Sequence, residues 1–215
     1  YGKHIKDKSA SQVLKSVRDS LADYRTGVRR NGQAVTLYYD TWPHVDIVPA
    51  SRVVDNDKLL HYEIPDMNRE VWLRSKPRLH SESLENHSSV CGPSFRKIIK
   101  MIKWWNHKHS EYLQSYHIEV MALRIFSSML NDLPWDVFSY FNAATDLIQS
   151  DLWHEGSQVD AYLSWSDRHE ASQRLENAKN LSREAWYATF GSNDDHESAI
   201  TKWRSVFGDS FPAYG

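Results

Sequence analysis

The sequence predicts an α+β fold in which a strand-containing first part is followed by a wholly helical second part. Runs of β-branched and aromatic residues separated by turn-forming residues lie between positions 33 and 73, and helical spacing of apolar residues begins at about Asn86. The 215 residues are 40% hydrophobic and include nine Trp, eleven Tyr and seven Phe, which supply enough apolar area for a packed core. We therefore divide the chain into residues 1–85 and 86–215.

The first part is predicted to hold one helix and two antiparallel hairpins. The apolar residues with helical spacing are Val13, Leu14, Val17, Leu21 and Tyr24. The predicted hairpins join 33–39 to 44–48 across the turn Asp40–Pro43, and 59–64 to 70–73 across the turn Pro65–Asn68.

The second part is predicted to contain only helices and loops. One helix carries an apolar face formed by Phe95, Ile98, Ile99, Ile102 and Trp105, with Lys97, Lys100 and Lys103 lying away from it. Further helices are predicted at 117–130, 135–148, 168–190 and 197–207, and loop or tail at 192–195 and 208–215.

Charge and cysteine usage exclude several classes of protein. The formal net charge is −2, so no global basic field favours nucleic acid, which we do not expect as a partner. The single cysteine, Cys91, excludes an internal disulfide and is typical of a cytoplasmic protein. With His87 it offers only two metal ligands, so we expect a buried or half-buried thiol.

The sequence contains no apolar run of the roughly 20 residues that a membrane helix needs. The chain begins with Tyr1-Gly2-Lys3, without an initiator Met or an apolar signal region. We therefore expect no membrane span, and either a processed chain or a fragment of a longer one.

Asp46 is the first candidate functional residue because it lies in the middle of the apolar strand His44–Ala50. A carboxylate there is costly to bury unless it is hydrogen-bonded, paired or bound to a metal. A solvent-facing aspartate on an edge strand explains the pattern equally well, and the strand alone does not decide between them.

Lys103, Ser115 and Tyr116 are the other candidates. A lysine on a helix, followed by Ser-Tyr at the start of the next helix, could hold a triphosphate and stack a base. The simpler interpretation is a solvated lysine, an N-cap serine and a tyrosine that packs in the core.

Several segments, in this order, make the sequence similar to a known family. They are Val45–Ala50, the hairpin with Tyr62–Pro65 and Trp72, the helix segment Ile99–Asn106, the helix start Gln114–Glu119, and the ending Lys202–Gly208 with Phe211-Pro212. The sequence resembles the bacterial cGAS/DncV-like nucleotidyltransferases, relatives of cGAS and oligoadenylate synthase, over nearly its whole length.

The resemblance implies part of a polymerase-β-like core followed by an oligoadenylate-synthase-like helical lobe. It implies an enzyme of bacterial antiphage signalling that joins nucleoside triphosphates into cyclic di- or trinucleotides, with two Mg²⁺ ions held by three carboxylates. Asp46 matches the third carboxylate, as metal ligand and catalytic residue. Lys103 and Ser115 match the contacts to the donor triphosphate, and Tyr116 matches the aromatic ring that stacks on a base.

The sequence also departs from the family pattern. It lacks the Gly-Ser motif and the Asp-x-Asp pair that carry the other two carboxylates, and Asp55-Asn56-Asp57 is predicted to be a turn instead. One carboxylate cannot hold two Mg²⁺ ions. We therefore expect this chain alone to be inactive unless a further N-terminal segment supplies the missing ligands.

Other interpretations remain open at this point. One is a non-catalytic fragment whose helical lobe binds a regulator or a ubiquitin-like conjugating enzyme, and another is a nucleic-acid-binding domain that uses Lys97, Lys100 and Lys103. In some operons of the family a conjugation system joins the C-terminal residue to a target. The resemblance thus implies a conjugation enzyme as a possible partner at Gly215, at the end of a flexible tail.

Overall fold

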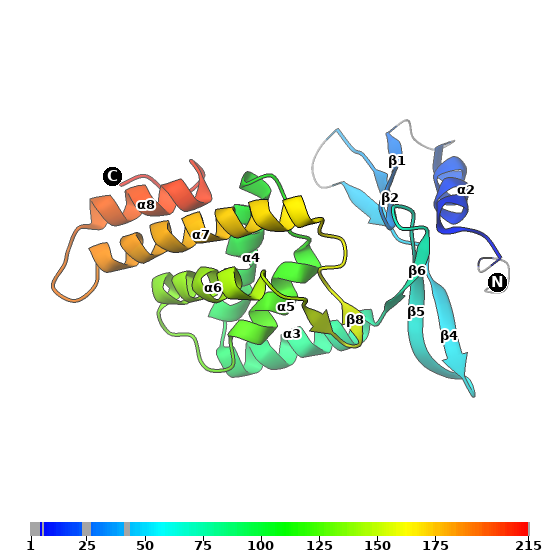
Figure 1. The fold of residues 1–215 in the computed structure, drawn as a ribbon, viewed down its shortest axis with the longest axis horizontal. Coiled ribbons are helices and arrows are strands. Elements are labelled where there is room, and N and C mark those ends of the chain that lie inside the picture. Colours follow the sequence, from blue (N-terminus) through cyan, green and yellow to red (C-terminus); the bar gives the residue numbers. More distant parts are fainter. Residues whose placement is uncertain (1–4, 6, 23–26, 41–43, 215) are drawn as a thin grey trace. The chain divides into compact units, whose positions relative to one another are not determined.

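Strands and helices segregate along the chain, which confirms the α+β fold class. The computed structural model describes residues 5, 7–22, 27–40 and 44–214. It divides into two units, Tyr1–Pro77 and Arg78–Gly215. Figure 1 shows the larger strands in the first unit and most of the helices in the second. The predicted features at Tyr1-Gly2-Lys3, Tyr24, Thr41–Pro43 and Gly215 lie outside the described residues.

The first unit contains two antiparallel three-stranded sheets and a helix, α2 (Ala10–Ala22). The first sheet has the order β1 (Val28–Asn31), β2 (Ala34–Leu37), β3 (Val45–Ile47). The second has the order β4 (Ser51–Asp55), β5 (Lys58–Asp66), β6 (Val71–Ser75).

Both predicted hairpins are present, as β2–β3 and β5–β6. The prediction missed strands β1 and β4, because both are short and contain arginine and other polar residues, which weakens the apolar signal. Asn56 and Asp57 form the tight turn between β4 and β5, with φ angles of 46° and 62°. Asparagine and aspartate tolerate this left-handed backbone, so the interpretation of Asp55–Asp57 as a turn is confirmed.

A small apolar core joins α2 to the strands of the first unit. Val13 and Leu14 of α2 are buried, as are Ala34 and Val35 of β2, and the helix contacts β1, β2 and β5. The amide of Met67 donates to the carbonyl of Gly32 at 3.1 Å, which links the ends of the two sheets. Strand β3 is attached to this unit through its hydrogen-bonded ladder with β2.

The second unit is built mainly from helices. They are α3 (Pro77–Cys91), α4 (Ser94–Lys108), α5 (Ser115–Ile125), α6 (Leu133–Leu147), α7 (Trp165–Ala188) and α8 (His196–Phe207). A short hairpin of β7 (Trp153–His154) and β8 (Ser157–Gln158) lies between α6 and α7 in the sequence. In Figure 1, α6, α7 and α8 run side by side, in agreement with the extensive contacts of α7 with both neighbours.

Two predictions for this part of the chain were wrong. Helical structure begins at Pro77, so residues 78–85, which we assigned to the first part, belong to α3. This helix carries few apolar residues, so its periodicity is weak. The second part is also not wholly helical, because Glu155 and Gly156 take φ angles of 50° and 78° and form the two-residue turn of β7–β8.

The predicted apolar face of α4 is confirmed. Its five members, Phe95, Ile98, Ile99, Ile102 and Trp105, are all buried in the core of the second unit. Helix α5 ends at Ile125, five residues before the predicted limit, where Phe126 takes an extended backbone. The remaining predicted helices match α6, α7 and α8 within three residues at each end.

Two further predictions concern the burial of the Cys91 thiol and the flexibility of the C-terminal segment. Cys91 is a fully buried thiol, and burial raises its pKa, as expected for a structural cysteine. Phe211 stacks on Phe207 at 6.0 Å, and its carbonyl accepts a hydrogen bond from the Arg204 guanidinium at 2.5 Å. The predicted flexible tail is therefore anchored to α8 as far as Phe211. Among the described residues, the helices are too short or too polar to cross a membrane.

Candidate functional site

Asp46 lies on β3, at the edge of the first sheet, and its side chain is exposed. Its Oδ1 atom accepts a hydrogen bond from the Thr36 hydroxyl at 2.5 Å, from the directly opposite position of β2. The expectation that burial makes this carboxylate costly does not apply, because the edge strand leaves it in contact with solvent. Its proposed role therefore depends on the family resemblance.

The described residues do not by themselves form the two-metal centre that the family implies. No group of three or more His, Cys, Asp or Glu side chains among them is placed to hold a metal ion. Asp46 supplies one carboxylate, and two Mg²⁺ ions require more oxygen ligands than one carboxylate offers.

Lys103 is the best-defined of the predicted nucleotide-binding residues. It lies on α4, a third of its side chain is exposed, and its Nζ donates to Glu119 Oε1 at 2.5 Å. An ammonium carries three N–H donors, so a contact with Glu119 still leaves donors that can bind phosphate oxygens.

Glu119 of α5 connects Lys103 to His80 of α3. Its second oxygen, Oε2, lies 2.7 Å from His80 Nε2. A carboxylate only accepts hydrogen bonds, so His80 must carry its proton on Nε2 here. Burial acts to raise the pKa of Glu119, but the hydrogen bonds and positive charges of His80 and Lys103 outweigh it and lower that pKa. Glu119 is therefore ionised and accepts from both partners.

Tyr116 packs beside the same group. Its ring lies 4.7 Å from the His80 ring and 6.1 Å from the ring of His154 on β7, both edge to face. Burial, followed by the negative charges of Glu155 and Glu119, raises the pKa of Tyr116 to about 12. The ring is half-buried, so it packs on the core while part of it stays accessible to a ligand.

Ser115 is the first residue of α5, and it is exposed. The alternative of Ser115 as an N-cap is wrong, because the N-cap position is occupied by Gln114 and no side-chain capping bond forms there. A hydroxyl at the first turn of a helix lies next to unpaired backbone N–H groups, which favour anions.

The second unit thus brings Lys103 and Tyr116 together through residues that we did not predict. These are His80, Glu119, His154 and Glu155. Glu119 was within reach of sequence reasoning, because it lies three residues after Tyr116 and so shares its helix face. His80 and His154 follow no sequence pattern, since only the packing of α3 and β7 on α5 brings them close. Asp46 belongs to the first unit.

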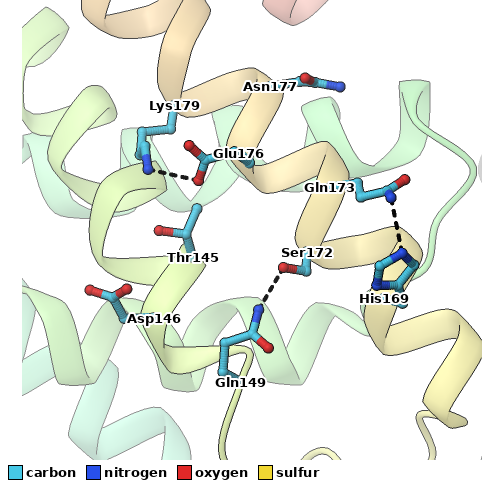
Figure 2. Close-up of a pocket in the computed structure, with 9 residues that line it drawn as sticks. All are labelled: Thr145, Asp146, Gln149, His169, Ser172, Gln173, Glu176, Asn177 and Lys179. Carbon is cyan, nitrogen blue, oxygen red and sulfur yellow. Dashed lines mark hydrogen bonds and ion pairs between the residues drawn. The ribbon is translucent and has the colours of Figure 1, made fainter.

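A separate groove of about 660 Å³ lies between α6 and α7 (Figure 2). Gln149 donates to Ser172 at 2.6 Å, Gln173 pairs with His169, and Lys179 pairs with Glu176. These three pairs occupy six of the nine residues that line the groove, and we place no site there.

His117, next to Tyr116, gives a prediction about acid stability. It is buried, and its Nδ1 lies 2.9 Å from the Tyr162 hydroxyl. Burial lowers its pKa to about 4; the charge of Asp160 opposes this, and that of Arg168 reinforces it. The unfolded chain binds the proton at about pH 6.5 and the folded one does not, so stability is lost as pH falls from 6.5 towards 4.

We expect this single group to remove about 2 kcal/mol of unfolding free energy between about pH 7.5 and pH 5. Urea unfolding at both pH values measures the loss. In His117→Phe the loss should shrink by a similar amount, and an unchanged pH dependence would show that His117 has the same pKa in the folded and unfolded chains.

Two curated proteins are similar to this chain, although no family model matches it. A probable cyclic nucleotide synthase of Bacillus cereus is 27% identical over 214 residues, which cover 94% of this chain and 63% of that protein. The cyclic AMP-AMP-AMP synthase of an Acinetobacter strain is 22% identical over 187 residues, covering 78% of this chain and 50% of that protein. The chain thus spans between half and two thirds of the length of these relatives.

Solved structures share the fold. CdnC of Escherichia coli MS115-1, determined with ATP, superposes with a TM-score of 0.71 at 16% identity, over 93% of this chain and 72% of that one. DncV of Vibrio cholerae, a cyclic AMP-GMP synthase and prokaryotic cGAS homolog, gives a TM-score of 0.64 at 14% identity, over 92% of this chain and 57% of that one.

Proposed function

We propose that this chain, a member of the bacterial cGAS/DncV-like nucleotidyltransferases, is the nucleotide-binding part of an enzyme that makes cyclic di- or trinucleotides. The observation that carries the proposal is the placement of Lys103 and Tyr116 on adjoining helices, joined by a shared network through Glu119 and His80. A phosphate-binding cation and a base-stacking ring are the two groups that recognition of a nucleoside triphosphate requires.

In this proposal Lys103 and Ser115 bind the triphosphate and Tyr116 stacks on the base. The Lys103 ammonium supplies charge-assisted hydrogen bonds to phosphate oxygens, and the exposed Ser115 hydroxyl lies at the N-terminus of α5, where the helix dipole favours negative charge. The half-buried Tyr116 ring packs against the rings of His80 and His154, which limits the rotation that would cost entropy on stacking.

Asp46 is proposed as the carboxylate that residues 1–215 contribute to catalysis. Mg²⁺ is the proposed cofactor of the synthase, where it would neutralise triphosphate charge and where Asp46 would supply one of its oxygen ligands. The exposed position of Asp46, with one oxygen held by Thr36, supports a role in which its other oxygen contacts a ligand.

Titration with three probes separates the two parts of the nucleotide site. Lys103→Ala should weaken binding of ATP and of inorganic tripolyphosphate by about 10-fold or more and leave adenosine binding unchanged, because it removes only a phosphate contact. Tyr116→Ala should weaken ATP and adenosine by at least about 5-fold and leave tripolyphosphate unchanged. Isothermal titration calorimetry on the full chain measures all three.

Two matched variants serve as controls. Lys100→Ala removes an exposed lysine one turn before Lys103 and should change none of the affinities. Tyr116→Phe keeps the ring and should bind adenosine as the unmodified chain does. If the unmodified chain binds neither ATP nor tripolyphosphate, the proposal is overturned, and the interpretation as a non-catalytic interaction fragment is favoured.

The role in antiphage signalling and a conjugation enzyme at Gly215 are further parts of the proposal. The resemblance supports both, and the family's products are signalling nucleotides.

A further inference from the structure

Glu119 poses an electrostatic problem for the proposed nucleotide site. It is an ionised carboxylate whose Oε1 atom lies 2.5 Å from the Lys103 ammonium, and Glu155 adds a second negative charge near Tyr116. A triphosphate that binds Lys103 must therefore approach a carboxylate of like charge. On charge alone, Glu119 should weaken the binding of an anion.

The geometry around Glu119 offers a compensating benefit. The carboxylate lies between two helices, accepting from Lys103 of α4 through Oε1 and from His80 of α3 through Oε2 at 2.7 Å. Both oxygens are thus occupied, and four fifths of the Glu119 side chain is shielded from solvent. A lysine side chain otherwise samples many rotamers, so a fixed acceptor holds its ammonium in one place.

We propose that Glu119, oriented by His80, is a positioning residue that fixes the Lys103 ammonium for the triphosphate of the nucleotide. The inference depends on the proposed function of Lys103. His80 contributes in two ways: its N–H fixes the orientation of the carboxylate, and its hydrogen bond draws negative charge away from the phosphates. Its ring also contacts Tyr116, so the same residue supports both parts of the site.

The direction in which a single substitution changes the affinity for tripolyphosphate tests this inference. Glu119→Ala removes a negative charge, so a purely electrostatic role predicts tighter binding of inorganic tripolyphosphate. A positioning role predicts weaker binding, by about 10-fold, as for other residues that orient a ligand-binding group. Glu119→Gln keeps an oxygen that accepts from Lys103, and should restore most of the affinity. His80→Phe keeps the ring but not the N–H, and should lie between Glu119→Ala and the unmodified chain.

A double substitution shows whether Glu119 acts through Lys103. In Lys103→Ala the further change Glu119→Ala should no longer weaken tripolyphosphate binding and should improve it, because only the repulsion remains to be removed. Glu176→Ala is the matched control, since Glu176 pairs with Lys179 in the same unit at 2.7 Å and should have no effect. Urea unfolding of each variant distinguishes lost binding from a lost fold.

The outcomes separate this inference from the proposed function. If Lys103→Ala leaves tripolyphosphate binding unchanged, the proposed function fails. If Lys103→Ala weakens binding but Glu119→Ala strengthens it or leaves it unchanged, the proposed function stands and the positioning role is overturned. Weakening that persists when Lys103 is absent would likewise contradict the inference.

Discussion

Asp160→Ala is expected to lower the free energy of unfolding of the helical unit by about 3 kcal/mol. The Asp160 side chain is fully buried and pairs with Arg168, the two atoms Oδ2 and Nη2 lying 2.5 Å apart. Its Oδ1 also accepts from the amide of Leu152 at 3.1 Å. Removing this carboxylate leaves the Leu152 amide without its acceptor and takes from the largely buried Arg168 its nearest counter-charge, although the Ile148 and Ser150 carbonyls still accept from it.

Urea unfolding followed by tryptophan fluorescence measures this loss. The pair of half-buried Lys179 and exposed Glu176 is the matched control, and Glu176→Ala should cost only about 0.5 kcal/mol because water screens the Glu176 carboxylate. A loss in Asp160→Ala no larger than the control would mean that the pair between Asp160 and Arg168 contributes nothing to joining the β7–β8 region to α7.

Under the proposed function, Asp46→Asn is expected to reduce cyclic nucleotide synthesis by at least about 100-fold when the full-length gene product is assayed. The amide oxygen of asparagine can still accept from Thr36, so β3 and its ladder with β2 should remain intact. What is lost is the negative charge that can accept a proton from, or attract a cation towards, the attacking hydroxyl. Chromatography of the products formed from labelled nucleoside triphosphates measures the rate.

Asp55→Asn provides the matched control for this second experiment. Asp55 is an exposed aspartate of the same unit, adjacent to the turn between β4 and β5, and its substitution should leave synthesis unchanged. Equal rates for Asp46→Asn and the unmodified protein would show that Asp46 is only a solvent-facing edge-strand residue. Equal losses in Asp46→Asn and Asp55→Asn would indicate a general effect of charge.

Elements with a strong apolar signal could be predicted from the sequence. The face of α4 from Phe95 to Trp105 is buried as predicted, because residues three and four apart must lie on one side of a helix. The hairpins β2–β3 and β5–β6 are present because each pairs two β-branched or aromatic runs that lie close together in the sequence. Strand β1 and helix α3 carry few apolar residues, so contacts with neighbouring elements determine them instead.

Some residues of the candidate site could likewise be predicted from the sequence, and others could not. Lys103, Ser115 and Tyr116 could be named from short segments that resemble a family, and Glu119 stands three residues after Tyr116 on the same helix. Whether Asp46 is buried or solvent-facing could not be decided from the sequence, since the position of β3 at the edge of its sheet depends on strand order, which local sequence does not encode.

The sequence by itself determined the α+β class and the apolar faces of the helices, because these depend on spacing along one element. The candidate nucleotide-binding residues came from a family resemblance and not from spacing. Only the tertiary structure brought His80 and His154 beside Tyr116, and joined Lys103 to Glu119 across two helices. The physical reason is that hydrogen bonds and ring contacts act over a few ångströms. Partners that are 16 and 39 residues apart along the chain, as Lys103 and His80 are from Glu119, meet only after the helices have packed.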